Sequence, residues 1–286
     1  MGLTVLKGHG TENDFVVVPD LDASLRLTAD DVVALCNRHA GVGADGVLRV
    51  VPTKAEPEVA EFADAAPWFM DYRNADGSIA EMCGNGARVF ARYLLDAGLV
   101  DPSAPLQIAT RGGVRAVAFT DDGRVSVDMG TAVRREESPL VRVGFTDGQG
   151  AVAFAGQAFD LPNPHVVCEV RTAEQLAALD LTRAPEVVPP LPEGQNVEFV
   201  HREGPRTVRM RVHERGAGET RSCGTGICAV VASVAGDEVE GTWTVHVPGG
   251  TLEVTSSPTG TLVLTGPAVL VGTVELADGW VQASLG

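Results

Sequence analysis

One short pattern occurs twice in this chain: residues 82–88 read MCGNGAR, and residues 222–228 read SCGTGIC. Each copy has Cys-Gly-x-Gly followed by a run of small apolar residues, which predicts the first turn of a buried helix. The first turn of a helix has backbone N–H groups that no helical carbonyl can accept, and its positive dipole end favours a thiolate. We therefore expect Cys83 and Cys223 to be reactive cysteines at two helix starts.

The similarity between the two halves of the chain extends beyond this pattern. Further blocks align in the same order in both halves, which indicates a duplicated half rather than a short-period repeat. Each half is predicted to run strand, strand, strand, helix, strands. The aligned blocks are 13–18 with 163–168, 46–50 with 196–200, and 71–78 with 211–218, in addition to the two cysteine patterns.

The composition is that of a globular protein. The chain has 286 residues, 44% of them apolar, which is enough for two domains with a core each. A net charge of −16 argues against nucleic acid or an anionic membrane as a partner, because both attract a basic face. No apolar stretch approaches the ~20 residues that a membrane helix needs, and the N-terminus lacks the layout of a signal peptide. We therefore expect a cytoplasmic protein.

The cysteine content supports that expectation. Five cysteines, an odd number, fit a reducing compartment better than a disulfide framework. Cys36, Cys168 and Cys228 lie among apolar residues and are interpreted as small buried hydrophobes. Because no Cys-x-x-Cys pair and no His-x3-His spacing occurs, we expect no metal site.

The apolar pattern also predicts the main elements along the chain. The linker 8–14 between the first two strands is polar and marked by glycines, which is typical of a turn. Thr28 is expected to be the N-cap of a helix that ends near Asn37. Strands are expected over residues 3–7, 15–19, 47–51, 68–73 and 125–129.

The remaining segments suggest where the domains begin and end. Residues 52–67 are expected to form a surface loop, and residues 185–193, rich in proline, an exposed connector. A last strand, residues 270–281, falls beyond the second repeat and is expected to return to the first domain. The predicted domains are residues 1–130 with about 270–286, which carry Cys83, and residues 131–269, which carry Cys223.

Two cysteines at matching positions of two domains suggest a cleft with one thiol on each side. That arrangement suits a two-base reaction, in which one thiolate takes a proton from a carbon and the other thiol returns one to the opposite face. The two thiols need opposite protonation, which His165 and Glu214 are candidates to set. The α-carbon of an amino acid is a weak acid, so backbone N–H groups would stabilise the developing charge. The candidate groups belong to Gly84, Asn85, Gly224 and Thr225.

The residues that carry these patterns closely resemble the diaminopimelate epimerase family, in order along almost the whole chain. The resemblance implies a cofactor-free interconversion of LL- and meso-diaminopimelate, a step in lysine and peptidoglycan-precursor synthesis. It implies an α/β (α+β) fold of two pseudo-symmetric domains, each a curled, mostly antiparallel sheet around a central helix. The resemblance leaves open whether the chain forms a homodimer. The matching stretches are 9–10, 13–15, 74–78, 81–86, 163–165, 196–198, 214–220 and 222–226.

The resemblance also implies roles for individual residues. Cys83 and Cys223 would be the acid–base pair, assisted by His165 and Glu214. Two departures from the family pattern are Thr11-Glu12, where many members carry Leu-Gly, and Gly46, which is often glutamine. We interpret both as subfamily variation. The implied substrate-binding residues are Asn13, Asn74, Asn163, Asn196 and Arg215 for the distal end of the substrate, Gly84, Asn85, Gly224 and Thr225 for the reacting carboxylate, and Glu214.

Two other functions compete with this interpretation. A proline-racemase-like enzyme would also use two cysteines, but it typically has histidine at the position of Asn85, and a cyclic substrate leaves no role for Arg215. A thiol–disulfide redox protein would normally carry its cysteines as Cys-x-x-Cys. A purely structural duplicated domain would not need asparagine and arginine side chains beside each cysteine.

Overall fold

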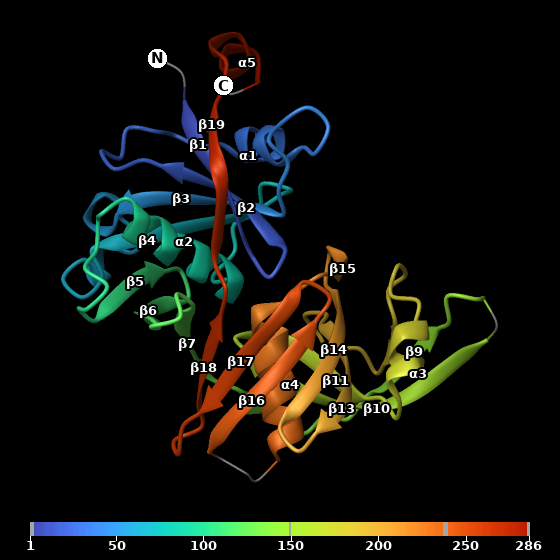
Figure 1. The fold of residues 1–286 in the computed structure, drawn as a ribbon. Coiled ribbons are helices and arrows are strands. Elements are labelled where there is room, and N and C mark those ends of the chain that lie inside the picture. The colour runs from blue at the N-terminus through green and yellow to red at the C-terminus, as the bar shows by residue number, and fades with distance from the viewer. Residues whose placement is uncertain (1–2, 149, 237–239, 285–286) are drawn as a thin grey trace. The chain divides into compact units, whose positions relative to one another are not determined.

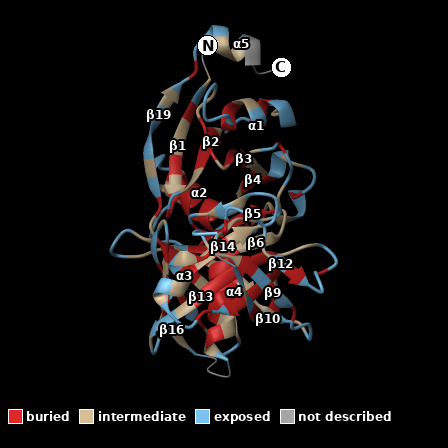
Figure 2. Cartoon of the chain, turned by 90° about the vertical axis from the view of Figure 1, so that its right-hand side faces the viewer, coloured by how far each residue is buried: buried red, intermediate tan, exposed pale blue. Residues whose placement is uncertain are grey.

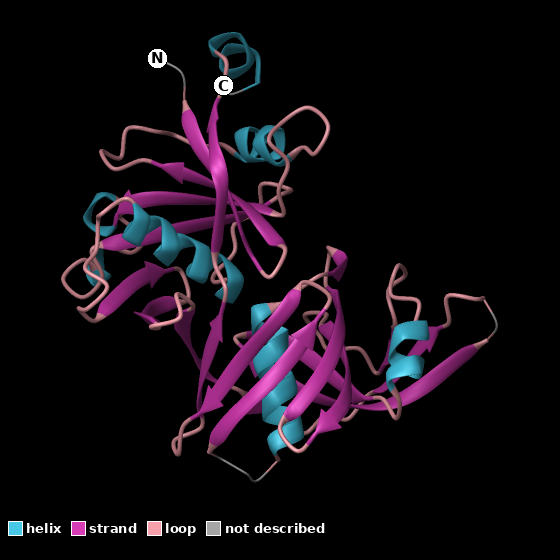
Figure 3. Cartoon of the chain, in the orientation of Figure 1, coloured by secondary structure: helices cyan, strands magenta, loops and turns pink. Residues whose placement is uncertain are grey.

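A computed structural model describes residues 3–148, 150–236 and 240–284. The chain folds as two compact units: Met1–Val127 with Pro267–Gly286, here unit 1, and Asp128–Gly266, here unit 2. Each unit consists mainly of strands with a few helices, as Figures 1 and 3 show. The predicted α+β fold class is therefore confirmed.

The sheet of unit 1 is mostly antiparallel. Only β2 with β3 and β4 with β5 run parallel among its described pairs; the other neighbours are antiparallel. The last strand of the chain pairs with the first, so the return predicted for this segment is observed. In spatial order the strands are β19 (Val269–Glu275), β1 (Thr4–Gly10), β2 (Asn13–Pro19), β3 (Gly46–Pro52), β4 (Trp68–Asn74), β5 (Leu106–Thr110), β6 (Gly113–Phe119) and β7 (Val125–Thr131).

Helix α2 (Gly84–Asp96) lies against one face of this sheet and contacts β1, β2, β3, β4 and β19. Its small and apolar residues are buried there, including Ala87, Phe90 and Leu94. Burial of a side chain as large as Phe90 stabilises the fold by about 2 kcal/mol. Figure 2 shows α2 among the buried parts of unit 1. The first turn of α2, with Cys83 before it, is thus held in a fixed place above the sheet.

The opposite face of the same sheet is covered by α1 (Ala29–Cys36) and by the segment that holds two short 3₁₀ helices, Thr53–Ala55 and Ala60–Phe62. Thr28 is the N-cap of α1, as predicted, and forms a capping box with Asp31. The segment 52–67 is more than the expected surface loop, because Thr53 and Val59 are buried.

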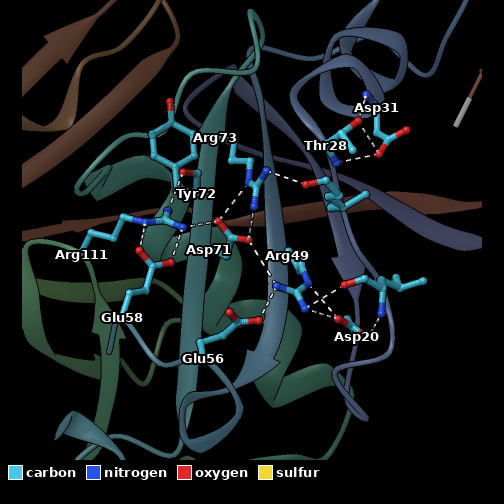
Figure 4. Close-up of polar contacts among 12 residues, drawn as sticks. Asp20, Thr28, Asp31, Arg49, Glu56, Glu58, Asp71, Tyr72, Arg73 and Arg111 are labelled. Carbon is cyan, nitrogen blue, oxygen red and sulfur yellow. Dashed lines mark hydrogen bonds and ion pairs between the residues drawn. The ribbon is translucent and has the colours of Figure 1, made fainter. Parts of the chain in front are cut away.

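A group of charged side chains is buried under this cover (Figure 4). Arg49 on β3 lies across from Asp71 on β4, and it donates to Asp20 and Glu56 as well. Asp71 also accepts hydrogen bonds from Arg73 and from Arg111. Burial opposes the charge of Asp71, but the Arg73 and Arg111 guanidinium groups lower the pKa of this carboxyl. The group therefore depends on its charges staying paired.

Unit 2 repeats the strand pairing of unit 1. Its strands β11 with β13 and β14 with β16 are parallel, and the strands that flank them are antiparallel. The register is repeated as well, because Val47 pairs with Arg73 in unit 1 and Val197 with His213 in unit 2. The strands are β8 (Val133–Arg134), β9 (Leu140–Gly144), β10 (Ala151–Leu161), β11 (Asn163–Glu169), β12 (Glu186–Val188), β13 (Asn196–Gly204), β14 (Thr207–Glu214), β15 (Gly218–Thr220), β16 (Gly241–Val247), β17 (Gly250–Ser256) and β18 (Thr261–Gly266).

Helix α4 (Gly224–Ala235) is the counterpart of α2 and contacts β10, β11, β13, β17 and β18. It is almost entirely apolar, and Ile227, Ala229 and Val230 are fully buried, as the red α4 of Figure 2 shows. A helix that is apolar all round needs a sheet on more than one side. The two short helices that remain are α3 (Ala173–Ala178) and α5 (Asp278–Ser284).

The structure corrects the expected bounds of three segments. The linker 8–14 belongs mostly to β1 and β2, so the turn consists of Thr11 and Glu12. The segment 185–193 is not simply an exposed connector, because β12 pairs with β9 and buries Val187. The expected strand 270–281 ends at Glu275 and is followed by α5. Within the described residues, no helix combines the length and apolar character of a membrane span.

Candidate active site

Both repeated cysteines are helix N-caps. Cys83 precedes α2 and Cys223 precedes α4, each with an extended backbone, and each Sγ accepts a hydrogen bond at 3.4 Å from the backbone N–H three residues later. The donors are Gly86 and Gly226. The prediction that the two patterns begin helices is confirmed. The first-turn N–H groups, which include those of Gly84, Asn85, Gly224 and Thr225, have no acceptor within their own helix.

In unit 1 the structure brings Asn13 and Asn85 to Cys83. Asn13 Oδ1 lies 3.7 Å from Cys83 Sγ and accepts from Asn85 Nδ2 at 3.1 Å. Asn13 in turn donates through Nδ2 to Asp45 Oδ2 at 2.8 Å. Asp45 thus fixes the orientation of the Asn13 amide, so that its oxygen faces the thiol.

Asp45 belongs to a small charged cluster behind Asn13. Arg38 donates to Asp45 and to Asp14, and Lys7 forms an ion pair with Asp14. Burial opposes the charge of Asp14, but Arg38 and Lys7 hold the pKa of this carboxyl well below its usual range. Burial raises the pKa of Asp45, which the bond from Asn13 partly offsets. The cluster makes the position of Asn13 depend on charges next to it.

Asn74 is the last residue of β4 and is held by its neighbours. Its Oδ1 accepts from the Tyr72 hydroxyl at 2.8 Å and its Nδ2 donates to Ser78 at 3.0 Å. The Tyr72 ring also fills the space beside Gly46, where an added Cβ would lie 2.8 Å from the ring and 2.6 Å from the Arg73 carbonyl oxygen. The glycine at this departure from the family pattern is therefore required by its surroundings.

The other departure, Thr11-Glu12, forms the turn between β1 and β2 with two positive φ angles, 52° and 60°. Non-glycine residues rarely adopt this conformation, so the turn needs support from its neighbours. Arg88, fully buried on α2, donates to Thr11 Oγ1 and to Asn85 Oδ1. It also donates to the Pro267 carbonyl oxygen at 2.8 Å. Arg88 therefore joins the turn to the start of α2.

In unit 2 His165 is fully buried beneath the start of α4. Its Nδ1 lies 2.7 Å from Glu198 Oε1, and its Nε2 lies 3.0 Å from Asn163 Oδ1. Two of the predicted site residues, His165 and Asn163, are thus in direct contact. Glu198 completes the group and is fully buried too.

Cys223 is buried, and its surroundings disfavour the thiolate. Burial, together with the charges of Glu214 and Glu198, raises the pKa of Cys223 well above its usual value. A contact with Thr225 Oγ1 at 3.4 Å and the Gly226 N–H act in the opposite direction but do not prevail. For Cys223, burial and the two carboxyl groups thus oppose the effect expected of the helix dipole.

Glu214 lies beside Cys223 at the end of β14. Burial raises the pKa of Glu214, although Thr220 donates a hydrogen bond to it and Cys223 also interacts with it. A carboxyl group with a raised pKa next to a thiol is suited to exchange a proton with it.

The last two predicted residues of this half are joined through the backbone. The Arg215 N–H donates to Asn196 Oδ1 at 2.8 Å. The exposed Arg215 guanidinium donates to the carbonyl oxygen of Glu193. An exposed guanidinium near an asparagine suits the recognition of a carboxylate.

Two residues of this site were missed by the sequence reasoning. Asp45 gives no signal beyond its place in a glycine-rich turn. Glu198 does give one: it interrupts an apolar strand and, by the two-residue period of strands, faces the same way as Asn196. A charged residue on the buried face of a strand marks a functional or paired group.

The three remaining cysteines lie in the interior of the chain. Cys36, Cys168 and Cys228 are buried, and burial raises the pKa of Cys36 to about 12. This fits their interpretation as small buried hydrophobes. In the part of the chain that the structure describes, no three His, Cys, Asp or Glu side chains gather as metal ligands.

Comparison with known proteins adds the family. The family model described as diaminopimelate epimerase matches residues 5–135 and 158–271. A diaminopimelate epimerase of Streptomyces coelicolor is 48% identical over 99% of this chain and 98% of its own length, and one of Thermobifida fusca is 49% identical over 97% of each. Among solved structures, a PhzF-family phenazine biosynthesis protein of Bacillus anthracis superimposes with a TM-score of 0.71 at 16% identity, over 97% of this chain and 99% of that one. That likeness concerns the fold alone.

Proposed function

The chain belongs to the diaminopimelate epimerase family, and we propose that it interconverts LL- and meso-diaminopimelate by a two-base reaction of its own thiols. The observation that carries this proposal is that both repeated cysteines are N-caps of matching helices, in a chain nearly half identical to named epimerases over its full length. The reaction is an isomerisation that serves lysine and peptidoglycan-precursor synthesis.

The proposed chemistry divides one proton exchange between two thiols. One cysteine, as thiolate, takes the α-proton of the substrate, and the other, as thiol, delivers a proton to the opposite face of the same carbon. Burial raises the pKa of Cys223, which suits this thiol to be the proton donor at the start of one direction. Cys83 is then the base in that direction, and the two exchange roles in the reverse reaction.

The developing negative charge is stabilised by backbone donors. We propose that the N–H groups of Gly84, Asn85, Gly224 and Thr225 hold the reacting carboxylate, because helix starts offer several such donors without reorganisation. Stabilisation of this kind is worth about 3 kcal/mol for each well-placed donor.

The other end of the substrate carries a second amino acid group. We propose that Arg215 binds its carboxylate and that amides bind the remaining polar groups, because an exposed guanidinium and amide side chains can pair with a carboxylate and an ammonium. The amides are those of Asn13, Asn74, Asn163 and Asn196.

The test is proton NMR in D₂O with reduced protein and LL-diaminopimelate, together with Cys83→Ala and Cys223→Ala. Loss of the α-proton signal with the wild-type protein, and loss of epimerisation in both variants, is the expected result. If the wild-type protein exchanges no proton of diaminopimelate, the proposal fails. Proline and hydroxyproline are assayed in parallel, and turnover of either one instead would favour the racemase alternative.

We further propose that the duplicated halves are two domains, 1–130 with about 270–286 and 131–269, so that each supplies one thiol. We propose a cytoplasmic location, because five cysteines, an odd number, fit a reducing compartment better than a disulfide framework. Fractionation of the native host with an antibody tests this location. Light scattering in solution tests for a homodimer.

A further inference from the structure

The side chains packed against the two cysteine-bearing helix starts differ between the two units. In unit 1 the second glycine of the pattern, Gly86, is contacted by Leu48 and Phe15. In unit 2 the equivalent glycine, Gly226, is contacted by Glu198. The strand register makes these residues counterparts, since Val17 pairs with Leu48 and Val167 pairs with Glu198. The same register places Phe15 opposite Gly46 and His165 opposite Asn196. The helix start at Cys83 therefore packs over two apolar side chains, Leu48 and Phe15. The helix start at Cys223 packs over a carboxylate and an imidazole, those of Glu198 and His165.

Glu198 is costly to keep in this position. Its side chain is fully buried, and in the described part of the chain its Oε2 has no hydrogen-bond partner. An added Cβ on Gly226 would lie 2.6 Å from Glu198 Oε1 and 3.3 Å from Cys223 Sγ, so the carboxylate and the thiol both lie beside this glycine. A buried carboxylate costs free energy unless it is paired and hydrogen-bonded. Leu48 shows that the scaffold itself does not need a charge here.

The groups that face Glu198 come from three elements. His165 and Cys168 lie on β11, Glu214 lies on β14, and Cys223 precedes α4. Among these, only His165 can carry a positive charge. The partner that Glu198 acts on is therefore His165.

The two ring nitrogens of His165 both face oxygen atoms. Glu198 Oε1 faces Nδ1, and the Asn163 carbonyl oxygen faces Nε2. A carboxylate and an amide carbonyl oxygen can only accept hydrogen bonds, so this arrangement is satisfied when both ring nitrogens donate. The Asn163 amide nitrogen is left pointing away from the ring.

We propose that Glu198 is a positioning residue of the epimerase: by holding His165 doubly protonated, it fixes which end of the Asn163 amide is offered to the substrate. The inference rests on the proposed function in so far as Asn163 binds substrate. The amide NH₂ group is then the end offered, which suits a carboxylate of the ligand. Unit 1 does this differently, because Asp45 there orients Asn13 through its NH₂ group.

A single change tests the idea, because Gln has the shape of Glu without its charge. In Glu198→Gln, the His165 ring keeps one proton, so Nε2 becomes an acceptor. It then repels the Asn163 carbonyl oxygen, and the amide turns over to donate its NH₂ group to the ring. The substrate meets an oxygen in place of the NH₂ group.

The first readout is ¹H–¹⁵N NMR of the histidine rings at pH 7 without ligand. His165→Gln identifies the His165 signals among those of the six histidines. We expect two protonated ring nitrogens in the wild-type protein and one in Glu198→Gln. A singly protonated ring in the wild-type protein would overturn the proposal. This result does not depend on the substrate, so it stands apart from any failure of the proposed function.

The second readout is steady-state kinetics with diaminopimelate across pH. We expect KM to rise about tenfold in Glu198→Gln, with a smaller change in kcat, because one hydrogen bond to the ligand is lost. Glu198→Asp, which keeps the charge, should recover part of the loss. Glu174→Gln, an exposed change on α3, is the matched control and should leave both constants unchanged. Unchanged KM in Glu198→Gln would contradict the proposal. If Glu198→Gln does not fold, Asn163→Ala and the wild-type ring spectra decide it.

Discussion

Leu48 and Glu198 occupy the same position in the two halves of the chain, and each touches the second glycine of a Cys-Gly-x-Gly turn. At Gly86 an added Cβ would lie 3.1 Å from a methyl carbon of Leu48, which can give way. At Gly226 it would lie 2.6 Å from a carboxylate oxygen that His165 holds in place. Gly226 is therefore harder to replace by a larger residue than Gly86.

Gly226→Ala is expected to displace Glu198 and to lower kcat/KM at least tenfold, with a loss of about 1–3 kcal/mol in the free energy of unfolding. Gly86→Ala should be near neutral in stability, because the gain of up to about 1 kcal/mol from replacing a helical glycine offsets a slight crowding of Leu48. Urea unfolding and the epimerase assay measure both. Equal effects of the two substitutions would contradict this difference.

Asp45→Ala is expected to lower kcat/KM about tenfold, because Asn13 loses the acceptor that turns its oxygen toward Cys83. Asp45→Asn keeps an oxygen that can accept this bond and should retain most of the activity. Steady-state kinetics of the two variants make the comparison. A loss as large in Asp45→Asn as in Asp45→Ala would show that the charge of Asp45, and not its hydrogen bond, matters.

Glu214→Gln is expected to remove activity and to add stability at neutral pH. Because burial raises the pKa of Glu214, the folded state disfavours its carboxylate, and this cost appears as the pH rises through the folded pKa. The variant has no such cost, so we expect it to be more stable by about 1 kcal/mol at pH 7. Its advantage should vanish in acid, where the wild-type carboxyl is protonated in both states. Loss of activity by about a hundredfold is expected for a proton-transfer partner. A variant less stable than the wild-type protein at pH 7 would count against this account.

Asp71→Asn is expected to destabilise unit 1 by about 3–5 kcal/mol, because it leaves buried guanidinium groups without their shared carboxylate. The pKa of Asp71 is lowered in the folded state, so its contribution is present above the unfolded carboxyl pKa and is lost as the pH falls through the folded one. Guanidinium unfolding from neutral to acid pH measures this. Asp122→Asn, which affects an exposed ion pair with Arg124, is the control and should change stability by less than about 0.5 kcal/mol. A loss in the free energy of unfolding for Asp71→Asn as small as that of the control would refute this prediction.

Local patterns explain which parts of the fold could be predicted. The helix starts at Cys83 and Cys223 follow from Cys-Gly-x-Gly, and the α1 start follows from Thr28. Each of these signals lies within a few residues of the structure that it predicts. The duplicated blocks also anticipated the repeated register of strands.

What could not be predicted depends on contacts between distant segments. The strand β12 has three residues, too few for a period, and Val187 is buried by its pairing with β9. The raised pKa of Cys223 results from burial and from Glu198 and Glu214 on other strands. The role of Glu198 was hidden for the same reason, since only the parallel pairing of β11 and β13 brings it to His165.

The pairing of β19 with β1 has a consequence for folding during synthesis on the ribosome. Strand β19 is made after the whole of unit 2, yet it completes the sheet whose other strands are made before unit 2. Unit 2, by contrast, is one uninterrupted stretch of chain. The usual order, in which the N-terminal domain folds first during synthesis, is therefore reversed in its final step. The segment that carries Cys83 must wait with an open strand edge at β1 until β19 has been made, so a chain interrupted before β19 would have a complete unit 2 and an incomplete unit 1.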